Sequence, residues 1–236
     1  MKYIATLIFA ILFSGAAIAQ LGVNATYRSN DAPDWSYSGA VLPAQDLLPE
    51  TAIAIGLDYW LAMKAYRIDF VPELNFSRMS NTLDMGIPLE TIEANLTSNW
   101  LSLFLNTNIY FLDLEGDCDC PTFSKSGGAV QKGIFLQVSP GATWMMNQAE
   151  FKEESKSFDD ITFSLGAALG LDIGLSDLVT LTPMAGFRYY LPAQWEGLAA
   201  FLSGPDIINI DGLKSEESSI RQFYAGLRLG FRLDQR

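Results

Sequence analysis

The chain has 236 residues with 15 basic and 27 acidic side chains, a formal net charge of −12, and no histidine. Such an acidic chain lacks the basic footprint that nucleic acids require, so we expect no nucleic-acid partner. Without histidine there is no Ser-His or Cys-His catalysis and no histidine-ligated metal, so the composition predicts a non-enzyme without cofactor or metal.

The first 19 residues have the composition of a secretory signal peptide. Lys2 supplies a positive charge, residues 4–13 form an apolar stretch, and Ala17-Ile18-Ala19 is a small-x-small cleavage sequence. The apolar stretch is shorter than the ~20 residues that a membrane-spanning helix needs, and no later segment reaches that length. We therefore predict a signal peptide at 1–19 and a single exported domain at 20–236.

The exported part alternates between an apolar face and a small or polar face, a pattern typical of β-strands with two different environments. Near the carboxyl end, Phe223, Leu227 and Phe231 alternate with residues such as Gly226 and Arg228. No charge interrupts any of the apolar faces, although 18% of the chain is charged. The alternation predicts eight strands at residues 20–28, 51–61, 66–77, 99–112, 132–146, 160–173, 178–190 and 221–234.

Uncharged apolar faces on every strand indicate that lipid is their solvent, because a Lys or Arg at mid-bilayer costs ~2–4 kcal/mol on such a face. The opposite faces are rich in glycine, serine, threonine and asparagine, which suit the interior of a narrow barrel. We therefore predict an all-β fold, a single eight-stranded antiparallel up-and-down transmembrane β-barrel. A soluble lipocalin-like ligand-binding barrel, with its apolar face inside, is the alternative.

The connections between strands alternate in length, as in outer-membrane barrels with short periplasmic turns and long external loops. Short connections at 62–65 and 174–177 predict periplasmic termini in the outer membrane of a Gram-negative cell, whereas the connection at 113–131 is long where a short one is expected. The predicted external loops are residues 29–50, 78–98, 147–159 and 191–220. Outer-membrane lipid is the expected partner of the barrel, and lipopolysaccharide or envelope proteins are candidate partners of the loops.

Aromatic residues lie at both ends of the apolar faces, a position typical of a bilayer interface. One predicted girdle, near the external end, contains Tyr27, Phe76, Trp144, Tyr189 and Phe223. The other contains Tyr59, Phe111 and Phe231. We expect the hydrocarbon layer between the two.

Charged residues of the opposite face are predicted to point into the barrel. The cations are Arg28, Arg67, Arg188, Arg228 and Arg232, and the anions are Asp58, Asp69, Glu73 and Asp172. Because an unpaired buried charge is costly, we expect a structural cluster of ion pairs that fills the lumen. A charge-selective narrow pore and a carboxylate-based catalytic site are the alternatives.

The segment around Cys118 and Cys120 is the most distinctive local sequence, with an acid at every second position from Asp113 to Asp119. A structural turn is the simplest interpretation. A strained local disulfide and a Ca²⁺ site are the alternatives, whereas the Cys-x-Cys spacing does not match a zinc finger.

Three predicted strands carry a proline within the alternation, in the sequences VPELNF (71–76), VSPGATW (138–144) and LTPMAGFRY (181–189). Together with the closing sequence GLRLGFR (226–232), they resemble the outer-membrane β-barrel proteins of Bacteroidota, the OmpX/OmpA-like and PorT-like group. The resemblance implies barrel architecture and, for PorT-like relatives, assistance to a secretion apparatus. Since each proline removes a hydrogen-bond donor from the ladder, we expect bulges at Pro72, Pro140 and Pro183.

The sequence thus predicts an integral outer-membrane barrel with a non-enzymatic, structural or interaction role. The alternatives are a narrow pore, a secretion-associated barrel, the soluble lipocalin-like barrel and a histidine-free lipid acyl transferase. The acyl transferase would require an apolar cavity open to lipid.

Overall fold

The computed structural model describes residues 20–38, 44–63, 67–84, 93–111, 133–151, 154–176, 178–202 and 213–232. The predicted signal peptide lies outside these residues. The long strands are β1 (Gln20–Asp31), β4 (Thr51–Met63), β5 (Ile68–Asp84), β6 (Glu93–Ile109), β7 (Ile134–Phe151), β8 (Glu154–Leu171), β10 (Val179–Gln194) and β11 (Glu217–Arg232). The short elements are β2 (Ser36–Tyr37), β3 (Gln45–Asp46), β9 (Ile173–Gly174) and α2 (Leu198–Leu202).

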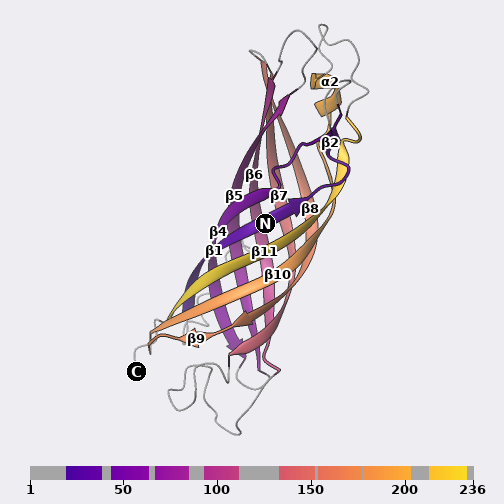
Figure 1. Cartoon of the computed structure of the whole chain (residues 1–236). Coiled ribbons are helices and arrows are strands. Elements are labelled where there is room, and N and C mark those ends of the chain that lie inside the picture. The colour runs from indigo at the N-terminus through magenta and orange to yellow at the C-terminus, as the bar shows by residue number, and fades with distance from the viewer. Residues whose placement is uncertain are drawn as a thin grey trace, which may run out of the picture.

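The long strands form a closed antiparallel sheet, because β11 pairs with β10 on one side and with β1 on the other (Figure 1). The short strand β9 continues β8: Gly170 faces Met184 and Gly174 faces Thr180 in one unbroken register with β10. Counted as one, they give a barrel of eight strands. The predicted eight-stranded up-and-down fold is confirmed.

The outer face of the barrel is a belt of exposed apolar side chains. Ile53, Ile161 and Phe223 expose 66%, 64% and 64% of their surface, whereas Ala52 and Thr162, next to them in sequence, are buried. Apolar exposure on every strand around a closed sheet matches a lipid solvent, since soluble proteins rarely expose contiguous apolar patches of this extent. The barrel therefore spans a membrane. The alternative of a soluble lipocalin-like barrel is wrong, because such a barrel has its polar face outside.

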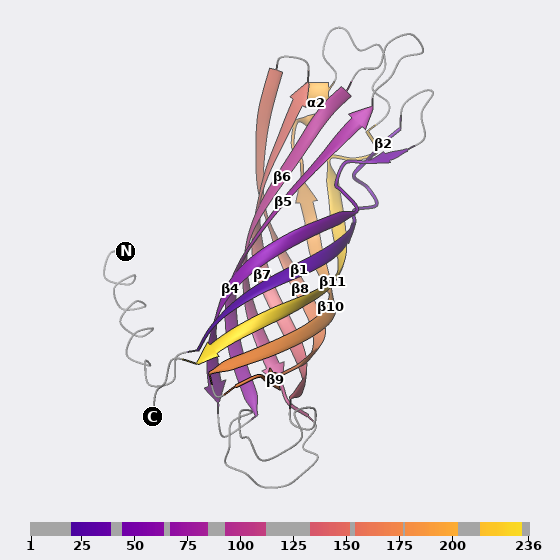
Figure 2. The ribbon, with the colours of Figure 1, turned by 60° about the vertical axis from the view of Figure 1, so that its left-hand side comes forward.

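Strands β5 to β8 continue beyond the other four at one end of the barrel (Figure 2). We call this the far end, and the end at which Gln20 pairs with Arg232 the near end. The predicted loops at 78–98 and 147–159 are therefore wrong in extent, because β5 stays paired with β6, and β7 with β8, almost to the hairpin tips. This extension rises past the apolar belt.

On the extension the polarity of the two faces of the sheet is reversed, so that the outer face is polar and the inner face is apolar. On β5, Arg78 and Thr82 point outward and are exposed, whereas Met79 and Leu83 point inward and are buried. Within the belt the same strand has the opposite arrangement, with Phe76 outside. A strand that leaves lipid for water needs this reversal, because its outer face then requires polar residues and its interior requires apolar ones.

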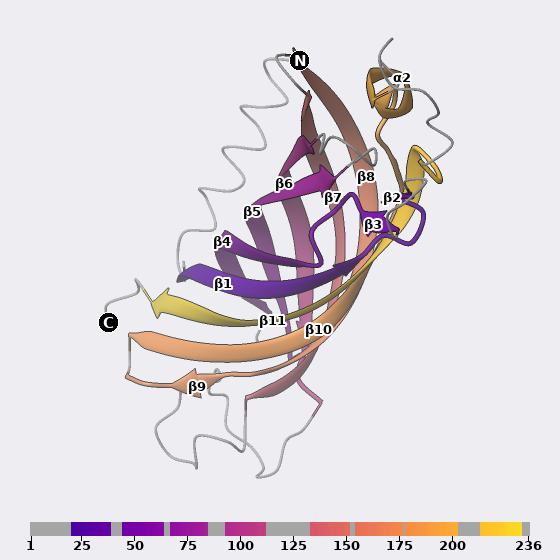
Figure 3. The same ribbon diagram turned by 45° about the horizontal axis from the view of Figure 1, so that its top comes forward.

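An apolar core fills the barrel at the far end. Trp35 packs on Trp195 with 5.3 Å between ring centroids, and Trp100 on Tyr190 with 5.4 Å. The elements β2, β3 and α2 lie over this end (Figure 3). Other members of the core include Leu47, Leu48, Leu83, Leu96, Met145, Ala149, Leu198 and Ile220. We call this group the far-end core.

The prolines do not produce the expected bulges. The register between β4 and β5 is the same on both sides of Pro72, and so is the register between β6 and β7 around Pro140. Each proline remains paired with its other neighbouring strand, because an antiparallel residue directs its N–H to one neighbour only. Opposite Pro183 the sheet is interrupted between β8 and β9 without a change of register. The barrel instead shifts register between Tyr190 and Ala193, which flank Pro192.

Candidate functional site in the barrel lumen

The lumen contains a buried ion pair between Arg228 of β11 and Asp58 of β4. Arg228 Nη2 lies 2.6 Å from Asp58 Oδ1, and Arg228 Nε lies 2.9 Å from both carboxylate oxygens. Strand β1 separates the two strands in the sheet. Its Gly22 permits the contact, since a Cβ there would lie 2.6 Å from Asp58 Oδ2 and 2.7 Å from Arg228 Nε.

Above this pair, amide side chains separate Arg28 from Glu73. Arg28 Nη2 donates to Asn75 Oδ1 at 2.6 Å, and Asn75 Nδ2 donates to Glu73 Oε1 at 2.9 Å. Asn106 Nδ2 donates to the second carboxylate oxygen of Glu73 at 2.7 Å. Both oxygens of Glu73 are therefore bound by neutral amides.

Arg188 lies next to aromatic rings in the middle of the lumen. Its guanidinium carbon is 3.6 Å from the ring centroid of Phe104 and 5.0 Å from that of Tyr224. Its Nη2 donates to Ser139 Oγ at 3.3 Å. Gly141 makes room for the Phe104 ring, because a Cβ there would contact the ring and lie 2.8 Å from the carbonyl oxygen of Leu103.

Asp172 is bound by hydroxyl groups towards the near end. Tyr110 donates its hydroxyl to Asp172 Oδ2 at 2.7 Å, and Thr182 donates to Oδ1. The Tyr110 ring packs on Phe135 with 5.4 Å between centroids. These residues narrow the lumen between the Arg228–Asp58 pair and the near-end opening.

The structure places seven of the nine predicted lumen charges inside the barrel, namely Arg28, Asp58, Asp69, Glu73, Asp172, Arg188 and Arg228. Arg67 is a correction: it lies in the turn before β5, with φ of 53° and an exposed side chain. Arg232 ends β11, and its side chain is outside the described residues, as are Cys118 and Cys120.

The predicted cluster of ion pairs is wrong in one respect. Among the described residues, Arg28 and Arg188 have no carboxylate within 4.0 Å, and neutral side chains bind them instead. The residues that sequence reasoning missed are Asn75, Phe104, Asn106, Tyr110, Ser139 and Thr182. Most of them share the inward parity of the charges, and that parity was the available signal.

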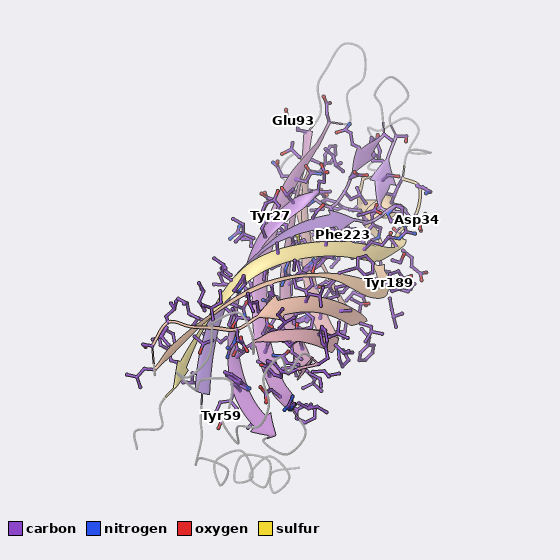
Figure 4. The ribbon with its side chains drawn as sticks, turned by 60° about the horizontal axis from the view of Figure 1, so that its bottom comes forward. Tyr27, Asp34, Tyr59, Glu93, Tyr189 and Phe223 are labelled. Atoms are coloured by element: carbon purple, nitrogen blue, oxygen red, sulfur yellow. The ribbon has the colours of Figure 1, made fainter. Side chains whose placement is uncertain are left out.

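The predicted girdle residues lie on the outer face of the barrel. Figure 4 places Tyr27, Tyr189 and Phe223 towards the far end and Tyr59 towards the near end. Phe76, Phe111, Trp144 and Phe231 are exposed on the same outer face. Phe223 also contacts Phe187, with 5.0 Å between ring centroids.

Two adjoining voids of ≈ 340 and ≈ 270 Å³ interrupt the packing of the lumen. The first is lined by Asp58, Tyr110, Asp172 and Arg228, and the second by Arg28, Arg188 and Tyr224. These volumes include all space that atoms do not fill, and each void has room for about one water molecule. In the described part of the chain, no three Asp, Glu, Cys or His side chains gather as a metal site would.

A closed eight-stranded barrel with an apolar belt and a filled polar lumen defines the class: a membrane-spanning β-barrel protein. No protein-family model and no curated protein matches the chain. None of the described helices is long and apolar enough to cross a membrane.

Several solved structures are similar to the chain. Ail, the attachment invasion locus protein of Yersinia pestis, is 9% identical over 91% of this chain and 99% of its own, with a TM-score of 0.41. Neisserial surface protein A is 13% identical over 89% and 95%, with a TM-score of 0.34. The N-terminal β-barrel domain of Pseudomonas aeruginosa OprF is 12% identical over 90% and 97%, also with 0.34. The resemblance to Bacteroidota PorT-like barrels stays a prediction.

Proposed function

We propose that the chain is an integral outer-membrane β-barrel of a Gram-negative cell with a non-enzymatic, structural or interaction role and a non-conducting lumen. The observation that carries the proposal is the filling of the lumen at three heights. The far-end core lies at the top, Arg188 stacks on Phe104 in the middle, and the Arg228–Asp58 pair lies below. An aqueous pore would need a continuous column of water past all three.

Electrical recording tests the closed lumen. The purified protein in planar lipid bilayers should give no steady conductance. Replacing Trp100 and Phe104 of β6 and Arg228 of β11 by glycine removes inward side chains at all three heights and should raise the current. The matched control replaces Leu101, Leu103 and Leu227, which point outward on the same two strands, and should stay silent. Stepwise conductance of the unaltered protein would contradict the proposal.

Non-enzymatic behaviour is supported by the chemistry of the voids. A lipid acyl transferase would need an apolar cavity that opens to lipid, whereas both described voids are lined mainly by charged and amide side chains. Incubation with phospholipid and lipopolysaccharide, followed by mass spectrometry, should detect no deacylated or acylated product. Product above the level of a mock preparation would overturn this part of the proposal.

The proposed orientation places the near end in the periplasm and the far end outside the cell. The support is that two of the three near-end connections in the sequence, 62–65 and 174–177, are short, and the polar outer face of the extension suits an aqueous exterior. In a Cys118→Ser/Cys120→Ser background, a membrane-impermeant maleimide on intact cells should label Ser80→Cys at the far end. Ser176→Cys, at the near end, should react only after cell lysis, and the reverse pattern would invert the orientation.

We also propose that the extension binds partners outside the barrel. Its outer surface carries polar and charged side chains such as Arg78, Asn95 and Glu150, which begin where the apolar belt ends. This surface is the proposed contact with lipopolysaccharide or envelope proteins. Assistance to a secretion apparatus rests on the sequence resemblance to PorT-like proteins alone.

A further inference from the structure

Two buried arginines share one void without a carboxylate partner. Arg28 and Arg188 are 2% and 4% exposed, and both line the ≈ 270 Å³ void in the middle of the lumen. Among the described residues, neither has an acidic oxygen within 4.0 Å. A buried cation without a counter-charge is costly, so we expect a negative charge close to these two arginines.

The charge around this void does not balance. Glu73 is the one carboxylate among its lining residues, and it faces two guanidinium groups. Asp58 is already bound by Arg228, and Asp172 is bound by Tyr110 and Thr182 in the neighbouring void. Counted over the side chains that line it, the ≈ 270 Å³ void carries an excess of one positive charge, and the fourth acid of the described lumen, Asp69, does not line it.

Several hydrogen-bond donors at the void also lack an acceptor. Arg28 Nη1, Arg188 Nε and the hydroxyl of Tyr224 are buried and have no partner among the described residues, and these three donors outnumber the one unpartnered acceptor at the void, Asn24 Oδ1. Glu73 offers them little, because its two oxygens accept hydrogen bonds from Asn75 and Asn106. Buried donors are nearly always satisfied in folded proteins, so a ligand with acceptor capacity is expected here.

We infer that this void is a binding site for one small monovalent anion of the halide class, held by Arg28, Arg188 and the Tyr224 hydroxyl. A single negative charge cancels the excess, and an acceptor without protons can take several donors at once. The room for about one water molecule suits a halide and excludes larger oxyanions. The site lies beside the Asp58–Arg228 void, through which an ion from the near end would pass.

Bromide in place of chloride makes the site visible, because its anomalous scattering distinguishes it from water. Crystals of the detergent-purified protein grown or soaked in bromide should give an anomalous peak between Arg28 and Arg188. The same crystals in fluoride or gluconate at equal ionic strength should not. Ordered water alone at this position in bromide would overturn the inference.

Variants separate this site from the rest of the lumen. Thermal unfolding in detergent, measured against bromide at constant ionic strength, should give an apparent dissociation constant. Arg188→Gln should weaken bromide binding by roughly tenfold or more, and Glu73→Gln should strengthen it, since the excess charge falls in the first and rises in the second. The double variant Asp58→Asn/Arg228→Gln removes a neutral pair and is the matched control, with binding changed by less than about twofold.

The outcomes are distinguishable even if Arg188→Gln fails to fold. The bromide peak in the unaltered protein and the effect of Glu73→Gln do not depend on that variant. Tyr224→Phe, which removes one donor and no charge, should weaken binding by a smaller factor than Arg188→Gln. Equal bromide affinity in the unaltered protein and Glu73→Gln would contradict a site defined by the excess charge.

Discussion

Gly22→Ala tests whether the barrel depends on the buried Arg228–Asp58 pair. The new Cβ would lie 2.6 Å from Asp58 Oδ2 and 2.7 Å from Arg228 Nε, so the carboxylate and the guanidinium must move apart. The three contacts between them, at 2.6, 2.9 and 2.9 Å, cannot all survive that movement. A hydrogen bond between charged groups contributes about 1.5–3 kcal/mol, so we expect a loss of about 2–4 kcal/mol in the free energy of unfolding.

Gly174→Ala is the matched control for this substitution. Its added Cβ would have no heavy atom within 4 Å, and both glycines lie in strands at the near half of the barrel. Any general effect of replacing a strand glycine by alanine is then shared by the two variants. The difference between them isolates the contact with the ion pair.

The assay is equilibrium unfolding by urea in lipid vesicles, followed by tryptophan fluorescence. In an Asp58→Ala background the same Gly22→Ala substitution should cost much less, because the carboxylate that it would displace is gone. Equal stability of Gly22→Ala and Gly174→Ala in the native background would refute the reasoning. It would mean that the ion pair relaxes around a methyl group without loss.

Three further predictions concern other parts of the barrel. Asp58→Ala leaves Arg228 buried without its partner and should cost about 3–5 kcal/mol, whereas Asp31→Ala, which removes an exposed pair with Arg221 at 3.7 Å, should cost less than about 1 kcal/mol, both measured by urea unfolding. Leu105→Lys, midway along the apolar belt, should cost ~2–4 kcal/mol in vesicles, whereas Thr82→Lys on the extension should be near neutral; equal costs would contradict the proposed edge of the bilayer. Trp100→Ala should cost about 3–5 kcal/mol through the cavity that it leaves in the far-end core, against less than about 1 kcal/mol for Asn99→Ala, which removes a half-buried, outward-pointing side chain of the same strand.

The sequence was sufficient for the barrel because a period of two fixes which residues share a face. Ile53, Ile161 and Phe223 could be assigned to the lipid side without knowing the register of any strand. The ends of the strands could not be assigned in the same way. At Arg78 the outer face of β5 becomes polar, and a criterion based on an apolar outer face therefore ends the strand before Asp84.

The sequence predicted which side chains point into the lumen but not which of them contact one another. Parity places Arg28, Arg188 and Glu73 inside, and the structure has all three there. Which of them meet depends on the stagger of the strands, which sets the height of each residue in the barrel. Arg228 reaches Asp58 across β1 because Gly22 leaves space at that height, and no spacing in the sequence encodes that contact. The prediction that Arg67 points into the lumen was wrong for a local reason, since Arg67 lies in the turn before β5 and outside the sheet.

The reversal of the two faces along β5 to β8 explains how one sheet closes its interior by two different means. Inside the belt the outer face is apolar, so the interior can be polar, and charges such as Arg188 are held by hydrogen bonds and aromatic rings. Beyond the belt the outer face is hydrated, and the sheet can be stable only with an apolar interior, which the far-end core supplies. The change from Ser77 to Met79 on the inner face, and from Phe76 to Arg78 on the outer face, therefore marks the same boundary from both sides. That boundary is the level at which lipid gives way to water.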